Sequence, residues 1–362
     1  MNEPIRILHI VTYMGRGGLE TMIMNYYRNI DRSKVQFDFL IHRDEKADYD
    51  DEIERLGGKI YRLPKLNPFS TLYLKKLDEF FKEHKEYRIV HCHQDCLSSV
   101  PLKYAKKHGV AFTIAHAHNT SQDKNIKYMI KIIAKRNIAK YADELFACGY
   151  EAGKWMFNTN DFTVLNNAID TELYIYNKNK SEKTKLKLGI NDKLVIGHVG
   201  RFNTPKNHKF IIEIFEEIKK IKKDSVLLLV GDGSLRADIE KIAINKKIYE
   251  DIKFLGVRDD VNDIMQVMDV FLFPSLYEGL PVTMVEAQSS GLKCFISDKV
   301  PSQCIITHNV DVISLEKQPT YWADKIVNSN YDRKNTKESI VKKGFDIKSN
   351  AKWLEDFYIK NY

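Results

Sequence analysis

Two glutamates flank a proline-containing turn in the second half of the chain. The run VFLFPSLYEGLPVTMVEAQSSG, residues 270–291, predicts a strand, a short loop and a helix with Pro281 in its first turn. Glu278 precedes that helix and Glu286 lies inside it. Eight helical residues span about 12 Å, so the two carboxylates are too far apart to form an acid/base pair. We expect them to contact opposite ends of one extended ligand, although either one alone is also explained as a solvated charge at a helix end.

The same loop offers a binding place for an anion. Backbone N–H groups at the start of a helix have no partner within the helix, and the helix dipole makes that end positive. A phosphate therefore fits between the two acids. The N–H groups concerned are those of Gly279, Leu280, Val282 and Thr283.

Positive side chains follow another predicted strand of the same half. GRFNTPKNHKF, residues 200–210, leaves the apolar strand KLVIGHVG and enters a helix. Arg201 and Lys206 are therefore expected at the carboxyl end of a parallel strand, which is the ligand-binding edge of an open α/β sheet. Both could be ordinary surface cations, but at this edge they can clamp a diphosphate. Gly231, in the turn GDGSLR after the next strand, permits either close approach of a ligand or a tight turn.

Short apolar runs alternate with amphipathic patterns along the chain, which predicts parallel βαβ units in an α/β protein. The polar, Lys-rich segment 171–192 separates two such series. We therefore expect two doubly wound, Rossmann-like domains that face each other across a cleft, residues 1–170 and 193–344, with 171–192 as a linker. An amphipathic terminal helix within about 345–362 is expected to pack back on the first domain.

The composition is that of an ordinary globular protein of two domains. The chain has 362 residues, 43% of them hydrophobic, and a net charge of +8. That charge suits nucleotides, sugar phosphates or an anionic membrane surface, and it is too small to indicate binding of nucleic acid. The five cysteines lack C-x-x-C spacing, which favours a reducing compartment. With no signal-peptide pattern and no apolar run of about 20 residues, we expect a cytoplasmic protein.

A metal site is the alternative suggested by His91, Cys92, His93 and Cys96, which lie close together in the sequence. No second ligand pair follows at zinc spacing, and the two histidines alternate with apolar residues where a predicted strand ends. We favour structural or substrate-contacting roles for them. We therefore expect no essential metal and no other cofactor.

Several motifs together resemble one enzyme family. GRGGLET, VLNNAID, GRFNTPK, LLLVGDGSLR, FLGVRDD and the run 270–291 are similar to those of the family-4 retaining glycosyltransferases of the GT-B fold, especially enzymes of bacterial capsule and exopolysaccharide synthesis. The combination of R-x4-K with E-x7-E carries most of this resemblance. It implies transfer of a sugar from a nucleoside-diphosphate sugar, more often a UDP-sugar, to a saccharide or lipid-linked acceptor. The sequence after Gly291 departs from the Gly-rich loop of the family, which indicates a subgroup.

The resemblance also implies individual roles. Arg201 and Lys206 would neutralise the donor diphosphate, while Glu278 would hold the transferred sugar and Glu286 the ribose. A histidine near the reacting carbon would be His118, although a purely structural role stays open for it. Candidate further contacts to donor or acceptor are Arg16 and His116. The remaining implied donor-binding residues are Gly17, Gly18, Gly231, Gly256, Val257, Gly279, Leu280, Pro281 and Thr283.

Other functions stay open at this point. A UDP-sugar epimerase of the same fold would need no acceptor, and a non-catalytic nucleotide- or sugar-binding protein would share the architecture. A nicotinamide dehydrogenase is disfavoured because GRGGLE lacks G-x-G-x-x-G spacing and Asp38 lies within a predicted strand. The basic segment 123–142 predicts a helix that either lies at an anionic membrane surface, where a lipid-linked acceptor would be presented, or packs on the core with a solvated face.

Overall fold

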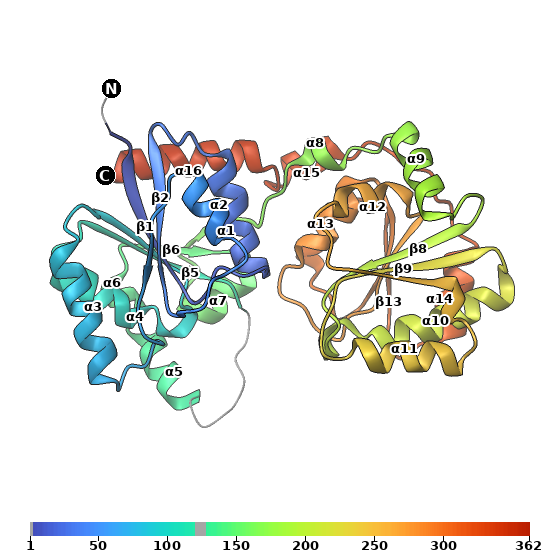
Figure 1. Ribbon diagram of the computed structural model, residues 1–362, viewed down its shortest axis with the longest axis horizontal. Coiled ribbons are helices and arrows are strands. Elements are labelled where there is room, and N and C mark those ends of the chain that lie inside the picture. The colour runs from blue at the N-terminus through green and yellow to red at the C-terminus, as the bar shows by residue number, and fades with distance from the viewer. Residues whose placement is uncertain (1–2, 120–127) are drawn as a thin grey trace. The chain divides into compact units, whose positions relative to one another are not determined.

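The chain folds into two α/β units, each built on one parallel sheet. The computed structural model describes residues 3–119 and 128–362 (Figure 1). The first unit comprises Met1–Ala168 and Asp346–Tyr362, and the second comprises Ile169–Phe345. The second unit thus interrupts the first, which is completed by the end of the chain.

The first sheet has seven strands in the order β3-β2-β1-β4-β5-β6-β7, and every neighbouring pair is parallel. Its order reverses between β1 and β4, as in a doubly wound sheet. The strands are β1 Ile5–Val11, β2 Val35–Ile41, β3 Ile60–Arg62, β4 Ile89–Cys92, β5 Phe112–Ala117, β6 Glu144–Ala147 and β7 Thr163–Val164.

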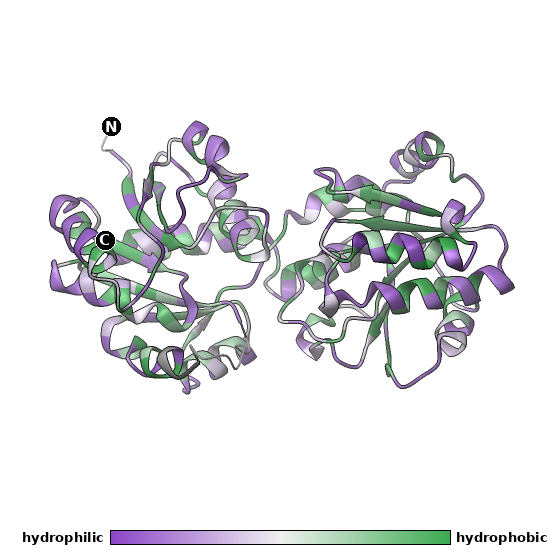
Figure 2. Cartoon of the chain, turned by 60° about the horizontal axis from the view of Figure 1, so that its bottom comes forward, coloured by the Kyte–Doolittle hydropathy of each residue, from purple (hydrophilic) through white to green (hydrophobic). Residues whose placement is uncertain are grey.

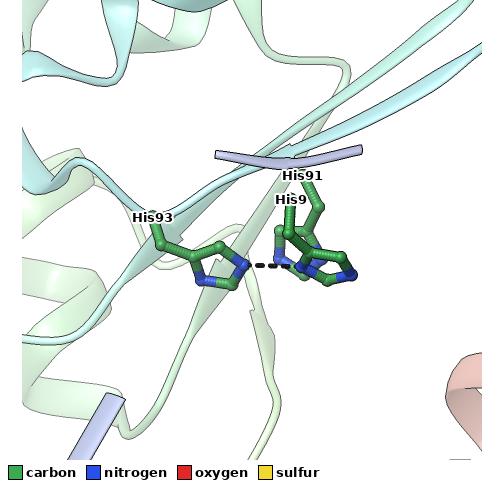
Figure 3. A group of neighbouring side chains, drawn as sticks. All are labelled: His9, His91 and His93. Atoms are coloured by element: carbon green, nitrogen blue, oxygen red, sulfur yellow. Dashed lines mark hydrogen bonds between the residues drawn. The ribbon is translucent and has the colours of Figure 1, made fainter. Parts of the chain in front are cut away.

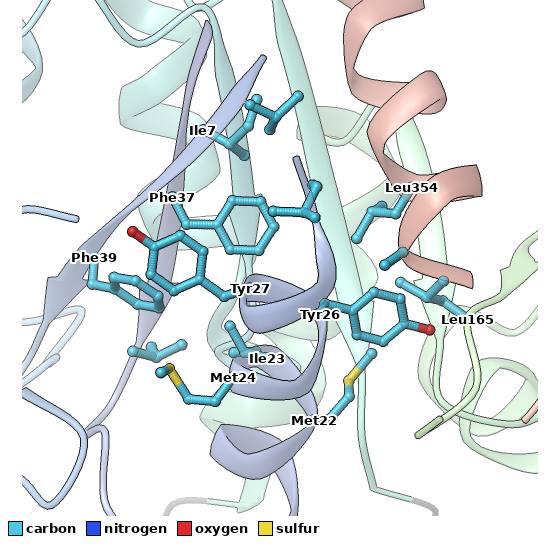
Figure 4. Packing of buried hydrophobic residues seen from close by; sticks show 14 of the residues in the cluster. Ile7, Met22, Ile23, Met24, Tyr26, Tyr27, Phe37, Phe39, Leu165 and Leu354 are labelled. Atoms are coloured by element: carbon cyan, nitrogen blue, oxygen red, sulfur yellow. The ribbon is translucent and has the colours of Figure 1, made fainter. Parts of the chain in front are cut away.

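Helices cover both faces of this sheet, because successive strand side chains enter different cores. On β1, Ile7 and Val11 pack into one core, whereas Leu8 and Ile10 pack into the other. Figure 4 shows part of the first core, where Tyr26 of α1 and Leu354 of α16 pack near the sheet. The helices of this unit are α1 Gly18–Asn29, α2 Asp50–Arg55, α3 Thr71–Glu83, α4 Ser99–Lys107, α5 Tyr128–Arg136, α6 Ile138–Tyr141, α7 Tyr150–Phe157 and α16 Ile347–Asn361, with a 3-10 turn η1 Asp95–Leu97.

The second sheet has six parallel strands in the order β10-β9-β8-β11-β12-β13. Continuous apolar runs such as SVLLLV in β9 form its buried centre, as expected for strands covered on both faces. Figure 2 shows hydrophobic strands beneath helices with hydrophilic outer sides. The strands are β8 Leu194–Val199, β9 Ser225–Val230, β10 Ile252–Gly256, β11 Val270–Phe273, β12 Lys293–Ser297 and β13 Val310–Ile313.

The helices of the second unit pack on both faces of its sheet through two separate apolar cores. They are α8 Thr171–Tyr174, α9 Lys178–Leu188, α10 His208–Ile221, α11 Arg236–Asn245, α12 Val261–Val267, α13 Val282–Ser289, α14 Pro319–Val327 and α15 Lys337–Lys342, with 3-10 turns η2 Thr204–Lys206, η3 Tyr249–Asp251 and η4 Ser302–Cys304.

The prediction of a linker at 171–192 is wrong. This segment forms α8 and α9 and belongs to the second unit. The Asn177 side chain accepts a hydrogen bond from the Lys180 N–H at the start of α9, and Gly189 ends the helix in the left-handed conformation. Ser181 anchors the helix by donating to the carbonyl of Gln266 at 2.7 Å. The lysines therefore belong to a capped helix: Lys180 and Lys185 form ion pairs with Asp263 and Asp269, and the others are exposed.

The terminal helix α16 packs against α1 of the first unit. Leu354 and Tyr358 are buried there, and Glu355 accepts a hydrogen bond from the backbone N–H of Asp31 at 3.0 Å. Among the described residues, no helix combines the length and apolar character that crossing a membrane requires.

Candidate active site

The strand order of the second sheet identifies its ligand-binding edge. The order reverses between β8 and β11, and in open α/β sheets ligands bind outside the carboxyl ends of strands at such a reversal. The two loops that begin there, residues 200–207 and 274–281, contain six of the residues expected to bind a nucleotide-sugar donor, namely Arg201, Lys206, Glu278, Gly279, Leu280 and Pro281. The fold therefore brings the two basic residues and the first glutamate to one edge.

Backbone and side-chain hydrogen bonds join these two loops directly. The Leu276 N–H donates to the carbonyl of Pro205 at 2.8 Å, and Asn207 Nδ2 donates to the carbonyl of Pro274 at 3.1 Å. The strands that precede both loops are buried in the apolar cores, so the loops are fixed by these strands as well as by the hydrogen bonds between them. Their side chains are thus presented from a fixed support.

Lys206 and Glu278 form an ion pair across the reversal. Lys206 Nζ lies 2.7 Å from Glu278 Oε1, and the two side chains are 16% and 11% exposed. The ammonium also lies over the ring of Phe273, 4.7 Å from its centre. The ammonium of Lys206 is therefore partly desolvated, and a ligand can reach it at this edge of the sheet.

Arg201 lies five residues before Lys206, and its side chain is in a more exposed environment. Its side chain is exposed and makes no hydrogen bond or ion pair to another described residue. Gly200 and Arg201 leave β8 next to the loop after β9. The guanidinium can therefore approach an anion without first losing a protein partner.

Gly231, the first of two glycines in the loop after β9, is required by the backbone conformation there. Gly231 has a φ of +130°, and a Cβ there would lie 2.2 Å from the carbonyl oxygen of Gly200. Its N–H donates to the carbonyl of Gly256 at 2.8 Å, which joins the ends of β9 and β10. A tight turn thus accounts for Gly231 without a ligand. The neighbouring Val257 presents a 61% exposed apolar side chain at the end of β10.

The start of α13 lies just after the ion pair. Pro281 precedes the helix in an extended conformation, one residue earlier than the first-turn position expected for it, and Val282 begins the helix. Gly279 and Leu280 are partly buried, and Thr283 Oγ1 is buried without a hydrogen-bond partner among the described residues. The helix start thus offers backbone N–H groups together with an unsatisfied hydroxyl.

Glu286, one turn further into α13, has a partner that the sequence analysis did not find. The Tyr174 hydroxyl of α8 donates to Glu286 Oε1 at 2.7 Å. Burial raises the pKa of the Glu286 carboxyl, and the hydrogen bond from Tyr174 opposes that rise. No signal for this contact exists in the motif itself, because Tyr174 lies in the segment that resembles a linker.

The loop after β1 carries the glycines expected to approach a phosphate. Gly17 caps α1 with an extended backbone, φ −115°, and a Cβ on Gly18 would meet no atom within 4 Å. The Arg16 N–H donates to Asp48 Oδ2 at 3.1 Å, and the Arg16 side chain is exposed. A Cβ on Gly17 would instead lie 2.3 Å from Glu20 Oε2, so only Gly18 has no local packing reason for being glycine, and a ligand is available as the reason there.

The ends of three neighbouring strands bring histidines together in the first unit. β1 lies between β2 and β4, and the parallel register pairs His9 with His91 (Figure 3). His9 Nδ1 lies 3.1 Å from His93 Nε2, and His93 Nδ1 lies 2.9 Å from His118 Nε2. His118, the predicted catalytic histidine, therefore ends a row of three imidazoles.

A second row lies against the first. The Tyr358 hydroxyl of α16 lies 2.7 Å from His91 Nδ1, and His91 Nε2 lies 3.1 Å from His116 Nδ1. The rings of His91 and His93 are 4.3 Å apart. His116 is thus a buried member of this row and offers no exposed face to a substrate. The H-x-H spacing at 91–93 and 116–118 was the available signal for the cluster.

The structure does not bring together the four residues first considered as a metal site. Cys92 and Cys96 pack in the core on the other face of the sheet from His91. Within the described ranges, the groups whose nitrogens lie within 4.8 Å of one another are three-histidine sets, His9 with His91 and His93, and His93 with His116 and His118.

The basic segment 123–142 is only partly visible. Residues 123–127 lie outside the described residues, and α5 and α6 cover most of the remainder. Lys135 Nζ lies 4.3 Å from the ring centre of Trp155, and Ile138 is buried, whereas Ile133 is 58% exposed. Lys135 of α5 and Ile138 of α6 thus pack on their own unit, whereas Ile133 does not.

Two doubly wound units, one with paired lysine and glutamate at its strand-order reversal, define the class of glycosyltransferases with the GT-B fold. Comparison with known proteins supports this class. The family model described as Glycosyltransferase Family 4 matches residues 16–173, and the one described as Glycosyl transferases group 1 matches residues 193–329. The chain belongs to the family-4 glycosyltransferases and is an enzyme of the hexosyltransferase type.

Individual relatives cover nearly the whole chain. It is 36% identical to the putative glycosyltransferase EpsF of Bacillus subtilis, across 98% of this chain and 96% of EpsF. It is 26% identical to the UDP-Gal:alpha-D-GlcNAc-diphosphoundecaprenol alpha-1,3-galactosyltransferase of Escherichia coli, across 79% of each. The crystal structure of Anabaena Alr3699/HepE in complex with UDP shares the fold, with a TM-score of 0.74, 18% identity and coverage of 97% of this chain and 94% of that chain.

Proposed function

We propose that this enzyme transfers a hexose from a UDP-sugar to a saccharide or lipid-linked acceptor during synthesis of a cell-surface polysaccharide, with retention of anomeric configuration. The observation that carries the proposal is the Lys206–Glu278 pair at the strand-order reversal of the second sheet. The UDP bound in the HepE structure and the UDP-Gal donor named for the Escherichia coli relative support a uridine nucleotide. The named acceptor of that relative, a diphosphoundecaprenol-linked sugar, supports a lipid-linked acceptor.

The charges at this edge suit a departing diphosphate. Arg201 and Lys206 would bind its oxygens, and the start of α13 adds backbone N–H groups with a positive dipole. Because these groups are held before the reaction begins, they stabilise leaving-group charge without reorganisation. We propose that no metal ion is needed for this step.

The other predicted residues would contact the sugar, the ribose and the base along the donor. Glu278, freed from Lys206 by the diphosphate, would hold a hydroxyl of the transferred sugar, and Glu286, oriented by Tyr174, would hold the ribose. The exposed Val257 beside Gly256 suits the face of a base. From the first unit, His118 would contact the transferred sugar, and Arg16 together with Gly17 and Gly18 would approach the phosphates.

Retention is proposed to proceed by attack of the acceptor on the face that the diphosphate leaves, with a leaving phosphate oxygen accepting the acceptor proton. No step assigns a nucleophile to the protein, since Glu278 already has a binding role. A covalent glycosyl-enzyme trapped on Glu278 would overturn this mechanism.

Calorimetric titration of the full chain with UDP, ADP and GDP in EDTA tests the donor class. We expect UDP to bind most tightly and without added metal. Sugar transfer is then followed with UDP-glucose and UDP-galactose, each with and without lipid-diphosphate-linked acceptors. Conversion of a UDP-sugar to its epimer without acceptor would identify an epimerase instead, and preferential binding of ADP or GDP would reject the uridine assignment.

A further inference from the structure

The row His9–His93–His118 has a feature that goes beyond the binding of a donor. Both of its hydrogen bonds join the Nδ1 atom of one ring to the Nε2 atom of the next ring outward. The outermost ring atom, His118 Nδ1, and the innermost, His9 Nε2, have no partner among the described residues. The row therefore runs in one direction from the core of the first unit to His118.

The three rings are neutral at physiological pH. Burial lowers the pKa of His9 and of His118 to about 3, and burial together with the adjacent imidazoles holds the pKa of His93 well below its usual range. Asp95 is the acidic group next to this row, and its carboxylate accepts hydrogen bonds from the His118 N–H and the Asn119 amide, not from an imidazole. A neutral imidazole has one N–H and one bare nitrogen, so each ring donates at one end and accepts at the other.

This connectivity forces the three rings to share one tautomer. If His9 carries its proton on Nδ1, it donates to His93 Nε2, and His93 must then donate from Nδ1 to His118 Nε2. His118 is left with its own proton on Nδ1. In the opposite case all three protons lie on Nε2 and point inward. Any mixture of tautomers would break at least one of the two hydrogen bonds.

The inner end of the row favours the outward direction. His9 Nε2 belongs to a residue that is 2% exposed, beside a cavity of about 10 Å³ whose lining includes Met22, Ile23 and Phe37 together with Tyr26 and the other buried histidines, and none of these donates to or accepts from Nε2. A buried N–H without an acceptor is the rarer defect in folded proteins, and the inward direction would place one there. The outward direction places the unpaired N–H on His118 Nδ1, an atom that is also buried but that belongs to a partly exposed side chain at the outer end of the row.

We propose that His9 and His93 are positioning residues that hold His118 in the Nδ1–H tautomer, so that His118 presents a hydrogen-bond donor to an oxygen of the substrate. In this tautomer Nε2 is occupied by His93, and His118 has no free lone pair with which to act as a base. The tautomer itself follows from the first unit alone. Only the identity of the oxygen, on the transferred sugar or its leaving phosphate, rests on the proposed function.

A metal ion is the other occupant that three clustered histidines could hold. Neither three-histidine group includes a carboxylate or a thiolate from the described residues. A divalent ion would then carry an uncompensated charge among apolar side chains, at a large cost in desolvation. Binding would also require breaking the His9–His93 or His93–His118 hydrogen bond.

The tautomers are measured directly by long-range ¹H–¹⁵N correlation spectra of the full chain labelled in histidine. We expect His9, His93 and His118 to appear at pH 7 as neutral Nδ1–H tautomers. Different tautomers within the row, a charged imidazolium, or Nε2–H on His118 would overturn the proposal. So would stoichiometric zinc in the purified protein that is lost in a His93 variant.

Variants separate the row from general effects on packing. The His93→Leu variant removes the donor to His118, and we expect the His118 signal to become a mixture of tautomers. The His93→Asn variant keeps an amide near the Nδ1 position and is expected to restore the Nδ1–H form. Tyr358→Phe breaks only the neighbouring row and is the matched control, with His118 unchanged. An unchanged His118 tautomer in a folded His93→Leu variant would overturn the proposal.

Kinetics distinguish this proposal from the proposed function. We expect His93→Leu to lower kcat for sugar transfer about 10-fold with little change in KM for the donor, and His93→Asn to recover most of that loss. If the tautomer shifts as expected while kcat stays the same, the row is upheld and the role of His118 in transfer is rejected. If the tautomer of His118 does not shift in His93→Leu, the proposal that His93 controls this tautomer is rejected, whatever the value of kcat.

Discussion

Lys206 Nζ lies 2.7 Å from Glu278 Oε1 across the point where the strand order of the second sheet reverses. Each residue neutralises the other in the unliganded protein, so a diphosphate that binds Lys206 also releases a carboxylate. That carboxylate lies next to the start of α13, where the sugar attached to the diphosphate would be held. The pair thus links recognition of donor charge to recognition of donor sugar.

Replacing the two partners should have opposite effects on binding of UDP. Lys206→Met keeps a long apolar side chain over Phe273 but removes the charge, so we expect weaker UDP binding and a fall in kcat/KM of about 100- to 1000-fold. Glu278→Gln releases Lys206, so UDP should bind about 10-fold more tightly while kcat falls. Calorimetry and initial rates measure both effects.

Lys293 provides the matched control for this pair. It lies at the start of β12, forms an ion pair with Asp311 at 2.8 Å and lies over Phe295. Because the start of a parallel strand is the opposite edge from the ligand-binding one, Lys293→Met should leave UDP binding and rate unchanged. Equal losses in the two lysine variants, or tighter UDP binding by Lys206→Met, would contradict the assignment.

Tyr174→Phe should weaken donor binding through Glu286. The variant removes the hydroxyl that donates to Glu286 Oε1, and we expect KM for the UDP-sugar to rise about 10-fold with a smaller change in kcat. If Glu286 binds the ribose, the same variant should bind 2′,3′-dideoxy-UDP as well as the unmodified protein does. Tyr331→Phe, which loses a hydroxyl bound to the carbonyl of Ile326, is the control. If Tyr174→Phe lost the same affinity for UDP and for 2′,3′-dideoxy-UDP, the proposed contact between Glu286 and the ribose would be rejected.

The sequence was sufficient for the two sheets because their central strands are continuous apolar runs, such as SVLLLV in β9. It failed at α9, whose Lys-rich, mostly exposed surface has the composition of a linker, although Asn177 and Gly189 were available as helix caps. It singled out His118 as a candidate and did not single out His9, because one polar residue within a strand carries no signal until the neighbouring strands are known. The Tyr174–Glu286 contact joins residues 112 positions apart and has no local signal.

Two glycines at the binding loops should respond differently to alanine. Gly231→Ala places a Cβ against the carbonyl oxygen of Gly200 at positive φ, and we expect it to destabilise the second unit by at least about 2 kcal/mol. Gly18→Ala meets no atom within 4 Å in the unliganded fold, so the melting temperature should not fall. If the loop after β1 approaches the donor phosphates, Gly18→Ala should still lower activity. Full activity in a stable Gly18→Ala protein would reject the proposal that the loop after β1 approaches the donor phosphates.

Mild acid should destabilise the first unit more than the second. A histidine whose pKa is lowered in the folded state contributes stability that is fully present above the unfolded pKa near 6.5 and is lost as pH falls below it, because the unfolded chain then binds the extra proton. Between pH 6.5 and 5.5 each such histidine costs about 1 kcal/mol. Burial lowers the pKa of six described histidines in the first unit, His9, His42, His91, His93, His116 and His118.

The second unit has two described histidines of this kind, His198 and His208, so it serves as an internal reference. We therefore expect the first unit to lose about 6 kcal/mol over this interval and the second about 2 kcal/mol. Hydrogen exchange measured by mass spectrometry in urea at pH 7.5, 6.5 and 5.5 reports the two units separately, through peptides from β1 and β4 and from β8 and β9. Replacing His91 with Phe should reduce the loss in the first unit by about 1 kcal/mol, because one proton-binding group disappears from the unfolded chain. Equal acid sensitivity of the two units would show that the imidazole rows are protonated in the folded protein, and the neutral rings on which the tautomer of His118 depends would then be excluded.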